Sequence, residues 1–140
     1  MKSIQELYEN IINEEKVMSD KELDKIIEKH NLWLNMKHGG EQANLSGKNL
    51  SKKNLTNVNL SKAILNGVNF KGSILNNVKF YKAVIMNSDF RNAELSKTDF
   101  TESNLEGSDF RGVELHKTIF KGANLKSVKY PSGISKDFIV

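Results

Sequence analysis

One apolar position recurs every five residues between residues 43 and 130, without a miss. The residue two places before each of these centres is small or β-branched in sixteen of eighteen units, and the exceptions are Lys48 and Lys53. A period of five matches neither the 3.6 residues per turn of an α-helix nor the alternation of a flat strand. An exact short repeat over 88 residues is typical of a solenoid. The centres are Leu45, Leu50, Leu55, Leu60, Leu65, Phe70, Leu75, Phe80, Ile85, Phe90, Leu95, Phe100, Leu105, Phe110, Leu115, Phe120, Leu125 and Tyr130.

The residues after each centre predict a turn in every unit. Gly or Asn stands two places after the centre at 47, 57, 67, 72, 77, 87, 92, 107, 112 and 122. These two residue types readily adopt the positive φ that a type II turn needs at its third position. Four such bends close a square, which predicts twenty residues per coil.

The aromatic centres support a coil of twenty residues. From residue 65 to 130 they occupy only two opposite sides of the predicted square, because they recur every ten residues. We therefore predict that the rings stack from coil to coil as the structural core: Phe70, Phe80, Phe90, Phe100, Phe110 and Phe120.

Two helices are predicted before the repeats. The first covers about residues 3–16, where apolar residues recur at spacings of three and four, at Ile4, Leu7, Tyr8, Ile11 and Ile12. The second begins at Ser19, because Ser19 and Glu22 have the spacing of a capping box. We expect this helix to end near residues 30–31 and the alternating residues 32–34 to be extended.

The residues that flank the repeats are expected to close the ends of the coil. Residues 1–42 form the predicted N-terminal helical cap, with Trp33 or Leu34 as the plug. Pro131 ends the repeats, because proline lacks the N–H that a further rung needs. Residues 131–140 then either cap the C-terminal end or make a dimer contact with a second copy, and both alternatives stay open.

Several units have the form of a known repeat. Residues 43–47 (ANLSG), 88–92 (SDFRN), 103–107 (SNLEG) and 123–127 (ANLKS) resemble the A(D/N)LXX unit of pentapeptide repeat proteins. The leader, from about residue 26 to Gly39–Gly40, resembles leaders of some bacterial members. The resemblance implies a mainly β solenoid, a right-handed quadrilateral β-helix of about four and a half coils over residues 43–130, with an N-terminal α-helical cap.

The amino-acid composition excludes several kinds of functional site. The chain has 140 residues and no Cys, which excludes disulfides and thiolate metal sites. Its N-terminus lacks the apolar run of a signal peptide, and no segment is long and apolar enough to span a bilayer, so we expect a cytoplasmic protein without membrane contact. The three His residues and the many Ser and Thr residues form no metal-binding or nucleophilic pattern. We expect no enzymatic activity, no cofactor, no metal and no small-molecule substrate.

Charge separates the leader from the repeats. Residues 1–42 carry 6 Lys and 9 Asp or Glu, a net −3, whereas residues 43–130 carry 12 Lys, 2 Arg and 7 Asp or Glu, a net +7. The best-known role in the family is binding of DNA gyrase by mimicry of DNA, and that role needs an acidic rod. We therefore expect a non-enzymatic scaffold that presents a rigid surface to an unidentified protein partner, with homodimerisation through the C-terminal end as one form. Weak binding of nucleic acid or another polyanion is the alternative, and gyrase binding ranks below it.

Two surface features are candidate contact sites. Lys71, Arg91 and Arg111 follow stacked centres, and Asp89 and Asp109 precede two of them, so these five residues form one strip. The strip is either a basic site for phosphates or an acidic partner, or a ladder of mutually compensating charges.

The second feature is apolar. Ile64, Val84 and Met86 fall on outward positions of one side, where Asn and Asp are otherwise common. This patch is either a contact surface for the leader helices or a second subunit, or a set of scattered exposed aliphatic residues.

Overall fold

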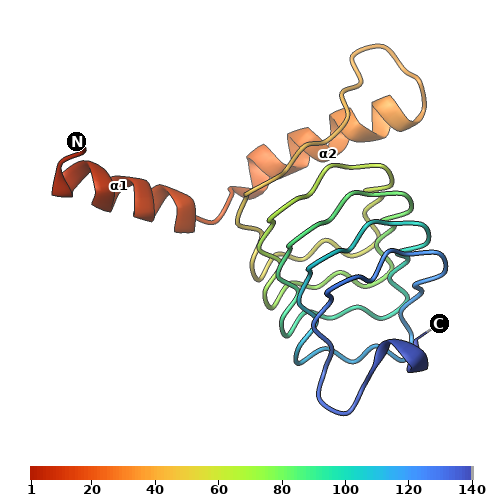
Figure 1. Ribbon diagram of the computed structural model, residues 1–140. Coiled ribbons are helices and arrows are strands. Elements are labelled where there is room, and N and C mark those ends of the chain that lie inside the picture. Colours follow the sequence, from red (N-terminus) through yellow and green to blue (C-terminus); the bar gives the residue numbers. More distant parts are fainter. Residues whose placement is uncertain (140) are drawn as a thin grey trace.

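The computed structural model describes residues 1–139, except for the side chains of residues 10–15. Helix α1 (Ile4–Glu15) and helix α2 (Asp20–Leu34) precede a coil formed by residues 43–130, and a short 3-10 helix, η1 (Lys136–Phe138), follows it. Figure 1 shows α2 lying across one end of the coil, α1 extending away from it and η1 at the opposite end. No helix in the described part of the chain is long and apolar enough to cross a membrane.

The coil repeats every twenty residues, as predicted. Isolated parallel bridges join the residue before a centre to the residue twenty positions later at every rung but one, for example Asn49 to Asn69 and Asn69 to Asp89. Each bridge is held by backbone hydrogen bonds, such as Leu50 N–H to the Asn69 carbonyl at 2.8 Å and Asn69 N–H to the Lys48 carbonyl at 3.0 Å. Neighbouring coils are therefore linked on each side by short stretches of parallel β-pairing.

The turns adopt the positive φ that the sequence predicts, and they do so with more residue types. All ten predicted Gly and Asn positions have positive φ. Lys52, Lys62 and Glu102 occupy the same turn position with φ values of 58°, 62° and 56°. The side chain before the centre often supports the turn, because its Oδ1 accepts a hydrogen bond from the N–H two residues later, as Asn54 does from Thr56 at 3.1 Å.

The aromatic core is confirmed. Phe90 stacks on Phe70 and Phe110 with ring centroids 4.9 and 4.8 Å apart, and Phe100 stacks on Phe80 and Phe120 at 5.0 and 5.4 Å. The two stacks also meet edge to face across the interior, for example Phe90 against Phe100 at 5.6 Å. Both arrangements are favourable for aromatic quadrupoles.

The leader forms two helices whose details differ from expectation. Helix α1 has the full capping box, between Ser3 and Glu6, whereas at α2 Ser19 Oγ accepts a hydrogen bond from the Glu22 N–H. The prediction that residues 32–34 are extended is wrong, because α2 continues to Leu34. An alternation over three residues is too short to distinguish a strand from the last turn of a helix.

Helix α2 closes the N-terminal end of the coil. Leu23 and His30 are buried on its inner face, and Met18 is buried just before it. Trp33 and Leu34 are only half-buried, so the predicted plug is wrong. The reason is the continued helical path, which points Leu23 and His30 into the coil and leaves the last turn at its edge.

Candidate interaction surfaces

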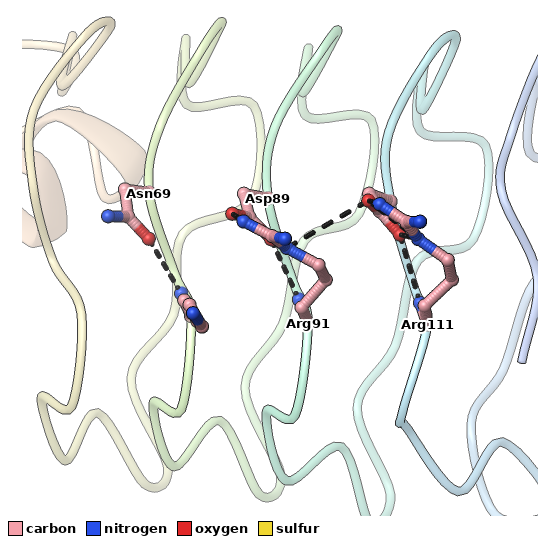
Figure 2. Close-up of polar contacts among 6 residues, drawn as sticks. Asn69, Asp89, Arg91 and Arg111 are labelled. Atoms are coloured by element: carbon pink, nitrogen blue, oxygen red, sulfur yellow. Dashed lines mark hydrogen bonds and ion pairs between the residues drawn. The ribbon is translucent and has the colours of Figure 1, made fainter.

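The charged strip is a ladder of ion pairs. Arg91 binds Asp89 through two nitrogens, with Nε 3.0 Å from Oδ1 and Nη2 2.8 Å from Oδ2. Arg111 binds Asp109 in the same way, with Nη2 2.6 Å from Oδ2. A longer contact of 3.9 Å from Arg91 Nε to Asp109 Oδ2 joins the two pairs. Figure 2 shows these pairs side by side on neighbouring coils.

The pairing keeps all four groups charged. Partial burial alone would raise the pKa of Asp89, but the hydrogen bonds and positive charge of Arg91 outweigh burial and hold this pKa below its usual range. The hydrogen bond from Arg111 lowers the pKa of Asp109. The two aspartates raise the pKa values of Arg91 and Arg111 in return. The arginines therefore reach solvent as partners of carboxylates and not as free cations.

Lys71 stands apart from these pairs, although it belongs to the same column. Its backbone N–H donates to Asn69 Oδ1 at 2.9 Å, and its ammonium has no ion-pair partner among the described residues. The structure thus brings together four of the five predicted strip residues and leaves one free cation beside them. This geometry corresponds to the compensating ladder more closely than to an open phosphate site.

The apolar patch consists of Ile64, Val84 and Met86. Ile64 and Val84 are bridged neighbours on successive coils, and the Met86 N–H donates to Asn66 Oδ1 at 3.0 Å. All three side chains are half-buried. Helix α2 lies across the end of the coil (Figure 1), so neither described helix rests on this patch.

Of the two lysines at inner positions, Lys53 has a role that the repeat pattern does not indicate. The half-buried side chain of Lys53 extends to the N-terminus of α2, where Nζ lies 2.5 Å from Asp20 Oδ1. Lys48 is exposed. The departure at Lys53 therefore connects the first coil to the cap, and only the position of α2 in space makes this visible.

One rung of the coil is broken. The bridges step from Ile74 to Glu94, but within residues 1–139 no bridge or hydrogen bond joins Glu94 to Glu114. Two carboxylates stacked at one rung spacing would repel each other. The following turn also differs, since Lys117 lacks the positive φ found at Gly112. The break opens a cleft of about 330 Å³ whose lining includes Glu94, Glu114, His116 and Lys117.

The broken rung does not assemble a metal site in the described part of the chain. Nowhere in that part do three or more His, Cys, Asp or Glu side chains come together in a way that could hold a metal ion. The cleft mixes two acids with a lysine and a histidine, and we assign it no chemistry.

The two ends of the coil differ. At the N-terminal end, His30 Nε2 donates to the Ser61 carbonyl at 2.9 Å and Nδ1 accepts from the Ala43 N–H at 2.9 Å. At the C-terminal end, an open groove of about 600 Å³ lies between the last coil and the chain terminus. Its lining includes Leu115, Pro131, Ile134, Phe138 and Ile139.

Comparison with known families agrees with the coil geometry. The family model for the pentapeptide repeat region matches residues 41–110 and 63–132, which together cover most of the chain. The chain belongs to the pentapeptide repeat family. The fold is accordingly the right-handed quadrilateral β-helix of that family.

Solved structures of pentapeptide repeat proteins match part of the chain. Rfr23, a pentapeptide repeat protein from the cyanobacterium Cyanothece 51142, is 31% identical with a TM-score of 0.61, and the match covers 64% of this chain and 61% of that one. A pentapeptide repeat protein of the Arabidopsis thaliana thylakoid lumen is 28% identical with a TM-score of 0.43, over 69% of this chain and 71% of that one. The match thus spans less than two thirds of Rfr23. No curated protein matches the sequence.

Proposed function

We propose that this pentapeptide repeat protein is a non-enzymatic scaffold whose C-terminal end binds a protein partner. The difference between its two ends carries the proposal. The N-terminal edge is closed by α2, whereas the N–H groups of Phe120 and Leu125 in the last coil find no acceptor within residues 1–139. Phe138, beside this edge, is 76% exposed. Unpaired strand groups next to exposed apolar surface form a ready site for another protein.

The proposal is tested by comparing proteins that co-purify with the full chain and with two variants. Phe138→Ser removes the exposed ring, and Ser135→Ala changes the preceding turn residue without removing apolar surface. We expect at least one protein to bind the wild type and Ser135→Ala alike, and to bind Phe138→Ser roughly thirtyfold less, the loss typical of a hot-spot aromatic. Equal recovery with all three chains would refute a C-terminal binding end.

Binding of a polyanion is the second candidate, and the unpaired lysines favour it. Lys62, Lys79, Lys97, Lys117 and Lys121 have no ion-pair partner among the described residues, in contrast to the two arginines. Generic duplex DNA is the probe. Affinity that falls steeply between 50 and 200 mM salt would support this function, because the slope reports the number of neutralised phosphates. No binding at low salt would remove it.

Gyrase binding by DNA mimicry is the weakest of the three. The repeats carry a net +7, and a mimic of DNA needs an acidic surface. A supercoiling assay with purified gyrase tests this role directly, and dose-dependent inhibition would overturn our ranking.

A further inference from the structure

The described apolar side chains of helix α1 are left uncovered by the rest of the described chain. Ile4, Leu7 and Tyr8 lie on one face at spacings of three and four, and they are 87%, 48% and 60% exposed. No hydrogen bond, ion pair or ring contact joins the described side chains of α1 to α2 or to the coil. A helix of twelve residues is marginal in water on its own and normally gains its stability from packing of its apolar face. This helix therefore needs an external surface.

The charge of α1 indicates which kind of surface the helix can bind. Residues 1–16 carry four Glu and two Lys, whereas the coil carries a net +7. Two α1 helices packed on each other would bring like charges together, which opposes a contact between two α1 helices. An apolar surface with a basic rim is the complementary partner.

The coil has such a surface at the apolar patch. Ile64, Val84 and Met86 are half-buried there, and Tyr81, which precedes the same side, is 37% exposed. Lys82 lies beside the patch with its ammonium 5.3 Å from the centre of the Tyr81 ring and 3.7 Å from Glu102 Oε2, so its charge is already partly compensated. Lys62, one coil earlier, is exposed, and its N–H donates to the Tyr81 carbonyl. The patch thus combines apolar area with a basic edge.

The direction of α1 indicates whether it contacts the apolar patch of its own coil or that of another molecule. Val17 is bridged to Asn49, and the Met18 N–H donates to the Asn49 carbonyl at 3.0 Å, so the chain is fixed to the coil directly after α1. Only Lys16 separates this anchor from the helix. Figure 1 shows α1 pointing away from its own coil. A helix held in this direction presents its apolar face to a neighbouring molecule.

We propose that α1 of one chain docks on the Ile64–Val84–Met86 patch of a second copy, and that the exchange is reciprocal. Apolar side chains of the helix cover the patch, and Glu9 lies toward the basic edge formed by Lys62 and Lys82. A reciprocal exchange forms a closed two-fold dimer and uses the same surface twice. The dimer contact then lies at the N-terminal arm, and the C-terminal end stays open for a different protein.

Sedimentation velocity on the full chain at rising concentration measures this association. Leu7→Ala removes apolar area from α1, and Leu7→Met, which keeps most of that area, is the matched control. We expect Leu7→Ala to weaken dimerisation by roughly tenfold or more and Leu7→Met to leave it within about twofold. On the coil, Met86→Asn should weaken it similarly without loss of folding, because Asn66 already occupies the equivalent turn position one coil earlier. A monomer at all concentrations, or equal dimerisation by all variants, would overturn the proposal.

Disulfide trapping locates the contact, because the natural chain has no Cys. A chain with Tyr8→Cys is mixed with one that has Met86→Cys and is oxidised, and a mixture of Tyr8→Cys with Lys71→Cys is the control from the charged strip. We expect a cross-linked heterodimer in the first mixture and little in the second. Equal cross-linking in both mixtures, or preferential cross-linking between two Tyr8→Cys chains, would contradict docking on a second copy. So would an intrachain disulfide in a chain that carries both Tyr8→Cys and Met86→Cys. Loss of the dimer in Phe138→Ser but not in Leu7→Ala would assign the contact to the C-terminal end instead.

Discussion

Two serines in equivalent core positions have opposite predicted effects on stability. Ser108 is fully buried, and its Oγ donates to the Ile85 carbonyl at 2.7 Å and accepts from the Ser88 N–H at 3.1 Å. Ser103 is also buried, but its Oγ has no hydrogen-bond partner in the described chain. Both are inner residues two places before a centre, so the sequence gives no reason to distinguish them.

Replacement by Ala separates the two environments. Ser108→Ala leaves a buried N–H and a carbonyl without this partner, and we expect it to lower the free energy of unfolding by about 1–3 kcal/mol. Ser103→Ala removes a buried hydroxyl that is not satisfied, and we expect a gain of about 1 kcal/mol. Alanine fits at the second site, because Ala83 and Ala123 occupy the same position on the neighbouring coils.

Urea unfolding followed by circular dichroism measures both changes. The two variants should unfold with the same dependence on urea as the wild type, so that a shift of the midpoint reports stability alone. The predicted order of midpoints is Ser103→Ala, wild type, Ser108→Ala. The hydrogen-bond account of the inner serines is refuted if Ser103→Ala destabilises the protein as much as Ser108→Ala does.

Three further predictions concern the core and the cap. Phe90→Ala should cost about 3–5 kcal/mol in the same unfolding experiment, because it leaves a cavity between two stacked rings. Burial lowers the pKa of His30 although its hydrogen bond to Ser61 favours the charged form, so the folded state resists protonation. Because the unfolded imidazole takes up its proton near pH 6.5, stability should be complete above that pH and fall as pH drops toward the lowered folded pKa, and His30→Asn should flatten this dependence. Asp20→Ala, which leaves the Lys53 ammonium unpaired, should cost about 1 kcal/mol, whereas Lys53→Met should cost less because it removes the charge as well.

The repeat could be predicted from the sequence because nearly every unit has the same pattern of residue types. The apolar centre recurs in eighteen consecutive units and the small or β-branched inner residue in sixteen of them, so exceptions at single positions do not change the period. The stacking of Phe90 on Phe70 and Phe110 follows from a coil of twenty residues alone. Local rules and the global fold agree here, as expected for a sequence with little frustration.

The ends of the coil were less predictable because they depend on contacts between distant residues. His30 looks like the end of a helix by propensity, yet its ring is buried because it bonds to Ser61 and Ala43, both far along the chain. Lys53 breaks the inner pattern because it meets Asp20. No local pattern identifies these partners, since each of them exists only after α2 lies across the first coil.

The charged strip shows that surface contacts were also difficult to predict from the sequence. The sequence places three cations in one column, but it does not state that Asp89 and Asp109 bind two of them through two nitrogens each. With Arg91 and Arg111 engaged in this way, the free positive charge lies on Lys71 and on lysines of other sides. Whether the strip contacts a partner stays a prediction.

The difference between the two ends also limits the assemblies that the chain can form. At the N-terminal edge, the carbonyls of Asn49, Ser61 and Lys62 are occupied by Met18, His30 and Gln42, so another coil cannot pair there without displacing α2. An open C-terminal edge that met an open N-terminal edge would produce head-to-tail filaments. The cap removes one of these two surfaces. Taken by itself, an association through the C-terminal end is therefore either with a different protein or between two identical ends, and neither contact alone propagates into a filament. The cap thus serves solubility as well as folding, because it allows the last coil to stay open without polymerisation.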